Sequence, residues 1–336
     1  MEASPTTRLS YFPTLLLLSF LPTPSSSSSS RSLATSVSCN KQDYTALMKI
    51  KASLLNPHHL ASWIPNTDCC NWSFVKCTSN TNLNTELSIF EANISGQIPA
   101  EVGDLTYLNY LAFQQITNLT GTITKLKFLG TLLRCCNNLS GPIPSFLGQL
   151  TNLVYLELNF NQLSGSIPES LGKSISWLIL SDNQLSGKIP KSFGDAHFDY
   201  INLLRNKLEG DASMLFISHN SFLSWDLPSL HAIPCNPILP LANGSTWNIE
   251  VASNTLAFNL SKVGFAKNLW RLDISHNKIF GSIPETITGS IEHLNVSYNQ
   301  LCGKIPQGGK VQKFDSYSFY HNNVVRRSPL VKQRRM

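Results

Sequence analysis

Residues 153–168 read Leu-Val-Tyr-Leu-Glu-Leu-Asn-Phe-Asn-Gln-Leu-Ser-Gly-Ser-Ile-Pro, and this stretch decides the fold. Its leucines are Leu153, Leu156, Leu158 and Leu163, with Asn161 between the last two. The same spacing returns at 175–185, 198–208, 269–279 and 291–301, with Ile, Val or Phe in place of some leucines. The closing Gly-x-Ile-Pro returns at 187–190, 281–284 and 303–306 and, near the front, at 96–99.

The glycines of this pattern give the period of the chain. They are Gly96, Gly121, Gly141, Gly165, Gly187, Gly210, Gly281 and Gly303, separated by 25, 20, 24, 22, 23, 71 and 22 residues, so that 71 equals about three periods. This period and leucine spacing are typical of the leucine-rich repeat. A coiled coil or helical array is excluded, because Gly-x-Ile-Pro recurs along the chain and breaks any long helix.

Each repeat is expected to form one coil of a solenoid. Strand side chains alternate between two faces, so the leucine-type residues point inward and fill a core that only a stacked neighbour completes. The asparagine should bond unpaired backbone groups of the next coil, and the glycine should adopt a positive φ. We predict an α/β fold: a leucine-rich-repeat right-handed solenoid with a concave parallel β-sheet and a disulfide-stapled N-terminal helical cap.

The chain divides into four regions. Residues 1–38 have the features of a signal peptide with a Ser-rich cleavage region, although a disordered tail is the alternative. A cysteine-flanked N-terminal cap at 39–80 precedes leucine-rich repeats at 81–306, which contain an irregular insertion at about 214–248. An atypical C-terminal segment with a basic tail occupies 307–336. No later run reaches the ~20 apolar residues of a membrane helix.

Secretion favours disulfides among the four N-terminal cysteines. Adjacent Cys69 and Cys70 do not bond each other easily, so each should pair outward, and we predict Cys39–Cys69 and Cys70–Cys77. The sequence has no metal-ligand spacing and no hydrolase or nucleotide-binding motif, so we expect no metal, no cofactor and no enzymatic activity.

The net charge of +6 does not indicate a polyanion-binding surface. Five excess positive charges lie in the last 16 residues and one lies in residues 1–38, so the body between them is neutral. Nucleic acid is therefore not an expected partner.

Several stretches outside the leucine pattern resemble one family. Cys39, Ser62-Trp63, Asp68-Cys69-Cys70-Asn71-Trp72 and Cys77 are similar to the N-terminal cap of plant extracellular leucine-rich-repeat proteins. Residues 95–105, 118–121, 207–213, 258–263, 294–299 and 314–318 resemble the polygalacturonase-inhibiting proteins. The resemblance covers roughly 39–320 and implies a secreted plant-defence protein of the cell wall, or apoplast. It implies binding and inhibition of fungal or insect endopolygalacturonases through the concave face, with cell-wall pectin as a further partner.

The repeat register predicts which side chains line the concave face. The column before the first buried strand residue is Glu86, Tyr110, Thr131, Tyr155, Trp177, Tyr200, Asn248, Arg271 and His293. The column between the buried residues is Ser88, Ala112, Leu133, Glu157, Ile179, Asn202, Glu250, Asp273 and Asn295.

From this face we select a partner-binding set: Tyr110, Tyr155, Glu157, Asn159, Trp177, Ile179, Ser181, Tyr200, Asn202, Glu250, Arg271, Asp273 and His293. Aromatic side chains are frequent interface anchors, although neighbouring aromatics on one sheet also stack for stability alone. The carboxylates make the face mildly acidic, which suits a basic cleft on an enzyme.

Seven Asn-x-Ser/Thr sequons are candidate glycosylation sites where they are exposed. They are Asn71, Asn93, Asn118, Asn138, Asn243, Asn259 and Asn295. Asn295 falls on the concave face, where a glycan would shield part of the surface.

Three features depart from the family pattern. Arg134 occupies a slot that should be apolar, which predicts local distortion or a shifted register. About one extra period separates Ser213 from Ile249, and we predict a poorly ordered bulge there. The family's cysteine-containing C-terminal cap is missing, so Cys302 has no evident partner and the core of the last coil is expected to be exposed.

Two alternatives to the inhibitor stay open. One is a soluble receptor-like ectodomain that senses a peptide or an oligosaccharide. The other is a degenerate, non-functional paralogue that folds badly.

Overall fold

The computed structural model describes residues 39–116, 118–120, 129–133, 137–216, 247–265, 269–289 and 291–325, all of which belong to one structural unit. The predicted signal peptide, Arg134 and most of the predicted insertion lie outside these residues. η7 ends at Phe216, and the next described strand begins at Trp247.

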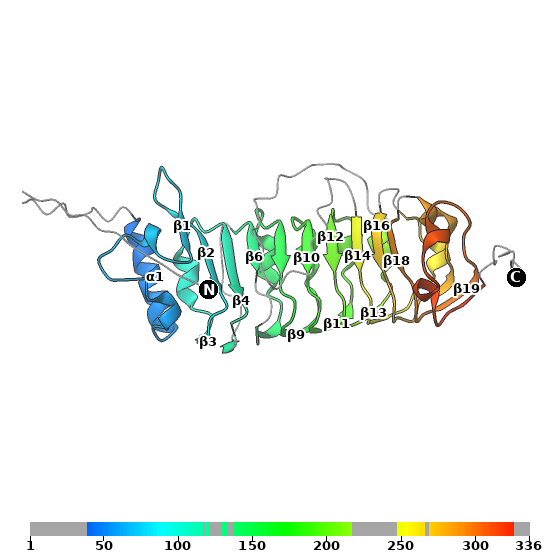
Figure 1. Ribbon diagram of the computed structural model, residues 1–336, viewed down its shortest axis with the longest axis horizontal. Coiled ribbons are helices and arrows are strands. Elements are labelled where there is room, and N and C mark those ends of the chain that lie inside the picture. The colour runs from blue at the N-terminus through cyan, green and yellow to red at the C-terminus, as the bar shows by residue number, and fades with distance from the viewer. Residues whose placement is uncertain are drawn as a thin grey trace, which may run out of the picture. The chain divides into compact units, whose positions relative to one another are not determined.

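A ten-stranded sheet takes its first strand from the N-terminal cap and the others from the repeats, and its strands lie side by side along the unit (Figure 1). In sheet order the strands are β1 (Val75–Cys77), β2 (Asn84–Phe90), β4 (Tyr110–Gln114), β6 (Thr131–Leu133), β8 (Tyr155–Glu157), β10 (Trp177–Ile179), β12 (Tyr200–Asn202), β14 (Trp247–Glu250), β16 (Leu269–Asp273) and β18 (His293–Asn295). β1 pairs antiparallel with β2, and the other neighbours pair in parallel.

The register of this sheet agrees with both predicted columns. Tyr155 pairs with Thr131 and Trp177, and Trp177 pairs with Tyr200. Beyond β12, Asn248 pairs with Arg271. The period-two alternation of the leucines therefore located the strand residues correctly.

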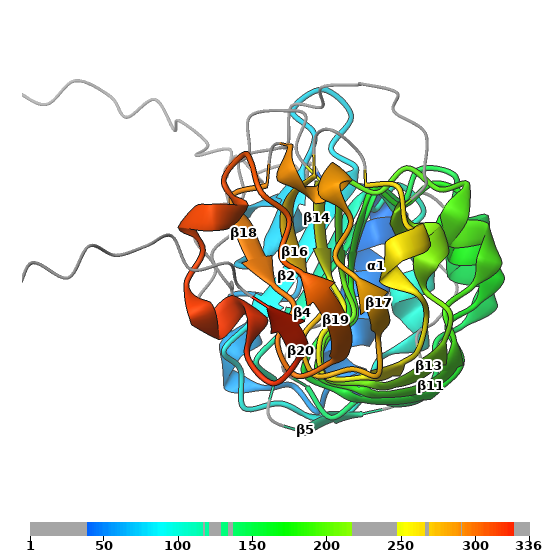
Figure 2. The ribbon, with the colours of Figure 1, turned by 90° about the vertical axis from the view of Figure 1, so that its right-hand side faces the viewer.

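Each coil returns through short strands and 3-10 helices. The returning strands are β3 (Ser95–Gln97) and β5 (Asn118–Thr120) in one sheet, β7 (Ser140–Pro142), β9 (Gln162–Gly165), β11 (Gln184–Lys188), β13 (Lys207–Gly210) and β15 (Thr255–Leu256) in a second, and β17 (Phe280–Ser282), β19 (Gln300–Lys304) and β20 (Asn323–Val325) in a third (Figure 2). The 3-10 helices are η1 (His58–Leu60), η2 (Cys69–Asn71), η3 (Ala100–Asp104), η4 (Ser145–Gln149), η5 (Glu169–Gly172), η6 (Lys191–Gly194), η7 (Ser213–Phe216), η8 (Leu260–Lys262), η9 (Glu285–Thr288), η10 (Val311–Lys313) and η11 (Ser316–Phe319).

The core lies between the ten-stranded sheet and these returns. Leu156, Leu158 and Leu178 are fully buried in it. Burial of each such side chain contributes about 1.5–3 kcal/mol. These leucines touch residues of neighbouring coils, so a single repeat cannot form this core alone.

A ladder of buried and half-buried asparagines joins successive coils. Asn183 Nδ2 donates to Leu158 O at 2.9 Å and to Leu180 O at 3.1 Å, and Asn183 Oδ1 accepts from Leu163 N at 3.0 Å. Asn206, Asn254, Asn277 and Asn299 make the equivalent bonds. The predicted backbone bonding is confirmed, but each asparagine reaches back to the preceding coil.

The repeat glycine has the predicted positive φ. At Gly281 φ is +89°, and a Cβ placed there would collide with the Asn259 side chain of the preceding coil. A residue with a side chain would therefore be strained at this turn and would also clash with its neighbour.

The N-terminal cap has one helix and two disulfides. Helix α1 (Lys41–Ser53) is capped at its N-terminus by Asn40, whose side chain accepts hydrogen bonds from the backbone N–H groups of Gln42 and Asp43. Disulfides join Cys39 to Cys69 and Cys70 to Cys77, as predicted.

The C-terminal segment differs from the prediction, because residues 307–325 form a further coil. β20 pairs in parallel with β19, and Asn322 continues the asparagine ladder by donating to Val296 O at 2.8 Å and accepting from Leu301 N at 2.9 Å. Val296 and Leu301 are fully buried. The expectation that the core of this repeat is exposed was therefore wrong, since a stacked coil covers it.

The register does not shift beside Arg134. Leu132 of β6 pairs with Leu111 and Leu156 in the common register, and Asn137 takes its ladder position by donating to Phe113 O at 2.7 Å. Of the two expected effects, the register shift is wrong for the described residues on either side of Arg134, and a local distortion at Arg134 itself lies outside the described residues.

Candidate protein-binding face

The side of the ten-stranded sheet that faces away from the core carries the predicted partner-binding residues. We call this surface the outer sheet face, and its side chains are those of the two columns and of the next alternate positions along each strand. It has an apolar part centred on β8–β12 and an ionic part centred on β14–β18.

The apolar part is a hydrophobic cluster separate from the solenoid core. Its buried members are Ala112, Leu133, Tyr155, Ile179 and Tyr200, with Tyr110 and Trp177 packed against them. The Tyr155 and Trp177 rings stack at 6.0 Å with planes 14° apart, and Trp177 lies 5.5 Å from Tyr200. This stacking supports the stability interpretation of the aromatic column, and half-buried Trp177 stays accessible to a partner.

Glu157 is bonded within the apolar part. It accepts a hydrogen bond from Tyr155 Oη at 2.9 Å, and both side chains are about 5% exposed or less. Burial raises the pKa of Tyr155 well above its ordinary value, and the nearby Glu157 carboxylate raises it further. The tyrosine hydroxyl therefore stays protonated and keeps donating to the carboxylate.

The ionic part is centred on an ion pair between neighbouring strands. Arg271 Nε lies 2.6 Å from Glu250 Oε1. Asn202 donates to Glu250 Oε2 at 3.3 Å and to Tyr200 Oη at 3.1 Å. Glu250 is therefore held by Asn202 from β12 and by Arg271 from β16.

Asp273 and His293 complete the ionic part. Asp273 Oδ1 accepts from Ser275 N at 3.1 Å and from Ser275 Oγ at 2.7 Å, and Asp273 Oδ2 accepts from Asn295 Nδ2 at 3.4 Å. The ring of His293 lies edge-on to Trp270 at 4.6 Å and is exposed to solvent.

Two pKa values are shifted in the ionic part. Burial raises the pKa of Glu250, and the Arg271 guanidinium opposes this shift by favouring the carboxylate. Burial and the charge of Arg271 both lower the pKa of His293. Because its pKa is lowered from an ordinary value of about 6.5, His293 is uncharged at neutral pH beside the Arg271–Glu250 ion pair.

The structure separates the thirteen predicted residues by exposure. Eight are buried: Tyr155, Glu157, Asn159, Ile179, Ser181, Tyr200, Asn202 and Glu250. Five keep accessible surface: Tyr110, Trp177, Arg271, Asp273 and His293. Two of the three predicted acidic residues belong to the buried group and are hydrogen-bonded or ion-paired within the protein, so only Asp273 of the three keeps accessible surface.

Sequence reasoning missed two features of this face. Ala112, Leu133 and Ile179 join the aromatics in one cluster, and the signal was the apolar residues in a column that should be polar. Ser275 donates a side-chain hydrogen bond to Asp273, and Ser297 donates one to Asn295. In both cases the serine lies two residues after the acceptor, just beyond the end of the strand.

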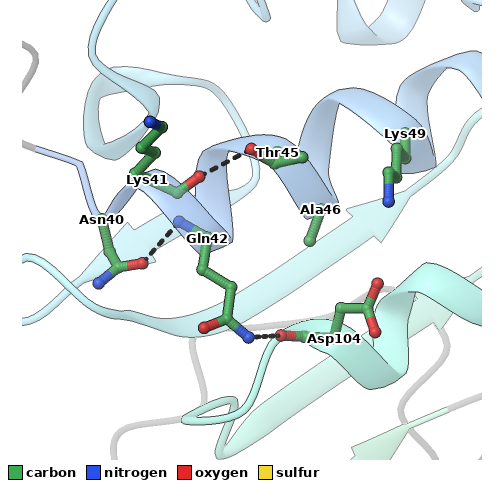
Figure 3. A pocket seen from close by; sticks show the side chains of 7 residues that line it. All are labelled: Asn40, Lys41, Gln42, Thr45, Ala46, Lys49 and Asp104. Atoms are coloured by element: carbon green, nitrogen blue, oxygen red, sulfur yellow. Dashed lines mark hydrogen bonds between the residues drawn. The ribbon is translucent and has the colours of Figure 1, made fainter.

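A pocket elsewhere on the protein lies where α1 meets η3 (Figure 3). It is lined by Asn40, Lys41, Gln42, Thr45, Ala46, Lys49 and Asp104. Gln42 Nε2 donates to Asp104 O at 3.4 Å across it. We assign this region to the contact between the cap and the first repeats.

Comparison with known proteins places the chain in a family. Residues 40–78 match the leucine-rich-repeat N-terminal domain, and 152–174, 174–196, 268–289 and 290–309 match the leucine-rich repeat. Polygalacturonase inhibitor 2 of Arabidopsis thaliana is 45% identical, with 87% of this chain and 92% of the relative covered. The polygalacturonase inhibitor of Vitis vinifera is 42% identical, with 98% and 99% covered. The chain belongs to the polygalacturonase-inhibitor family.

A solved structure supports the fold of this family member. A plant ice-binding protein is 34% identical and has a TM-score of 0.64, with 85% of this chain and 96% of the other covered. In the described part of the inhibitor-family chain, no helix has the length and apolar character needed to cross a membrane.

Proposed function

We propose that this chain is a secreted plant-defence protein that binds fungal or insect endopolygalacturonases through the outer sheet face and inhibits them. The identity to named polygalacturonase inhibitors over most of both chains is the observation that carries the proposal. A rigid coil array also suits an inhibitor, because side chains that are fixed before binding lose little entropy on binding.

Inhibition of purified enzymes tests this proposal. The secreted chain is added to a panel of fungal endopolygalacturonases, and the release of reducing ends from polygalacturonate is measured against inhibitor concentration. We expect a dose-dependent fall in rate for at least one enzyme. A folded preparation that neither binds nor slows any member of the panel excludes the function.

A pair of aromatic variants tests the surface. Trp177→Ala removes an accessible ring of the outer sheet face, whereas Phe280→Ala removes a 44% exposed ring on β17 of the third sheet. Loss of an aromatic anchor weakens binding by about tenfold or more. We expect this loss for Trp177→Ala and unchanged inhibition for Phe280→Ala. Equal inhibition by both variants would exclude the apolar part from the interface.

The chain alone is expected to leave polygalacturonate intact, because we propose an inhibitor and not a hydrolase. Incubation without enzyme should release no reducing ends, and co-sedimentation with de-esterified pectin tests the polymer as a second partner. Measurable hydrolysis by the purified chain would contradict the assignment.

A further inference from the structure

The ionic part of the outer sheet face presents one accessible cationic side chain held by a neighbour. Of the nine residues in the first column, Arg271 is the one with a permanent positive charge. Its side chain is 39% exposed, and that of Glu250, its ion-pair partner, is 10% exposed. A guanidinium has five N–H donors, so an ion pair through Nε does not exhaust its capacity to donate.

The side chains beside Arg271 fix its position before any partner arrives. Glu250, Asn202 and Tyr200 are all buried, and the Asn202 amide bonds both Glu250 and Tyr200. Glu250 therefore cannot change rotamer without leaving buried polar groups unpaired, which is costly. An arginine held in this way loses little freedom on binding.

Charge around Arg271 limits what it can bind. Glu250 offsets the charge of Arg271, and Asp273 lies two residues further along the same strand. A carboxylate of the partner gains less electrostatic energy here than it would beside an isolated arginine. A neutral carbonyl oxygen of the partner can therefore compete with it for the guanidinium. Both ligands offer the same chemistry, which is an acceptor oxygen for the guanidinium N–H groups.

We propose that Arg271 is a specificity-determining residue, which donates to an acceptor oxygen of the bound polygalacturonase, and that Glu250 and Asn202 position it. This inference rests on the proposed function. Trp177 on β10 is the apolar anchor, as Arg271 on β16 is the polar one. β10 and β16 are separated by three strand spacings of the sheet, or about 14 Å. The enzyme surface must therefore offer an apolar contact and an acceptor oxygen at that separation.

Affinity measurements on arginine variants test the contact. The dissociation constant is measured for wild type, Arg271→Ala, Arg271→Lys and Lys207→Ala with an enzyme that wild type inhibits. Lys207 is the control, because it is also a cationic, exposed side chain but lies on β13 of the second sheet. We expect Arg271→Ala to bind about tenfold or more weakly, Arg271→Lys to fall between, and Lys207→Ala to stay within about threefold.

A double-mutant cycle tests the positioning role of Glu250. If Glu250 acts through Arg271, Glu250→Ala weakens binding in the wild-type background and has little effect in Arg271→Ala. If Glu250 has only a structural role, Glu250→Ala weakens binding equally in both backgrounds, and that result would overturn the positioning role of Glu250. Glu250→Gln keeps an acceptor for Arg271 and serves as the second variant if Glu250→Ala does not fold.

The remaining outcomes separate the two proposals. If wild type binds and Arg271→Ala stays within about threefold, or if Lys207→Ala loses as much affinity as Arg271→Ala, the Arg271 assignment is overturned while the inhibitor function stands. If wild type binds no enzyme, both fail. Salt identifies the acceptor, because the Arg271→Ala effect shrinks at high ionic strength for a carboxylate and persists for a carbonyl.

Discussion

Asn183 joins two coils with a single side chain. Its amide bonds backbone groups of its own coil and of the preceding one, and all of these bonds are buried. Asn183→Ala leaves several buried backbone groups without partners, so we expect the free energy of unfolding to fall by about 2–4 kcal/mol. Urea unfolding measures the change. Gln184→Ala, one residue on and exposed, is the control, and an equal effect there would contradict a special role for the ladder.

The stability of the fold is expected to depend on pH through the protonation of Asp43. Its buried side chain accepts from Asn84 N at 2.7 Å, and burial raises its pKa while this hydrogen bond opposes the shift. A carboxyl whose pKa is higher in the folded state stabilises the fold most at low pH, and this contribution is lost as the pH rises through the folded-state pKa. Asp43→Asn keeps an acceptor oxygen but does not titrate.

We therefore expect Asp43→Asn to gain stability relative to wild type as the pH rises above about 4. Thermal unfolding of both proteins across the acidic range measures this difference. Asp104→Asn, which changes an exposed carboxyl, is the control. Parallel pH profiles for wild type and Asp43→Asn would refute the assignment.

Sequence reasoning located the face residues but not their exposure. The columns followed from strand alternation, because Tyr155, Trp177 and Tyr200 occupy one position of a fixed repeat. Exposure depends on the size and bonding of neighbours in adjacent coils. Glu157 is thus buried with Tyr155, while Arg271 stays accessible although it pairs with Glu250.

At the scale of elements, the C-terminal coil is expected to behave as a true repeat. Phe319 of η11 is 5% exposed, whereas Tyr317 of the same element is 73% exposed. Phe319→Ala removes a buried ring, which costs about 3–5 kcal/mol, and Tyr317→Ala should cost little. Urea unfolding compares the two, and equal stabilities would mean that this coil does not support the core.

Sequence reasoning missed this coil because it keeps the inward-pointing residues and the asparagine of the repeat but lacks the Gly-x-Ile-Pro turn. Phe319, Asn322 and Val324 each follow their counterparts Val296, Asn299 and Leu301 by 23 residues, but no Gly-x-Ile-Pro comes after them. The inward positions and the ladder asparagine are enough to stack one more coil, since the glycine matters for the following turn. The absence of the cysteines expected in a C-terminal cap likewise does not decide whether this segment stacks on the preceding coil.

The two cap disulfides close loops of different length, with separations of 30 and 7 residues. In the chain-entropy model the longer loop contributes about 3–4 kcal/mol and the shorter about 2 kcal/mol. We expect the double change Cys39→Ser with Cys69→Ser to lower the thermal midpoint more than Cys70→Ser with Cys77→Ser. Cys302→Ser, at an exposed free thiol, is the control. The reverse order would contradict the loop-length argument.

For the whole molecule, the core residues and the proposed binding residues are different sets on the same strands. Leu156 and Leu178 point into the core, while Tyr155 and Trp177 occupy the outer sheet face. Substitution in a column therefore leaves the leucine core in place, although the ring contacts between Tyr155, Trp177 and Tyr200 also join neighbouring coils. A polygalacturonase inhibitor and an ice-binding protein are both similar to this chain, so one scaffold is compatible with different functions.

Glycans must leave the outer sheet face open if that face binds an enzyme. Among the described side chains, the sequon asparagines Asn71, Asn93 and Asn138 are exposed, whereas Asn295 lies beside Asp273 on the face and donates Nδ2 to it. An N-glycan is attached through this same nitrogen, which points toward Asp273, so a glycan at Asn295 would cover the surface next to Arg271. We expect glycans at the three exposed sites and none at Asn295.

Enzymatic deglycosylation in heavy-oxygen water, followed by peptide mass spectrometry, reads each site of the secreted protein. Asn138→Gln is the matched control: it should remove one glycan and leave inhibition unchanged, because Asn138 lies next to β7 in the second sheet. A fully occupied Asn295 in a protein that still inhibits would place the enzyme elsewhere, since a glycan on β18 and an enzyme contact at Arg271 of the adjoining strand cannot share this surface.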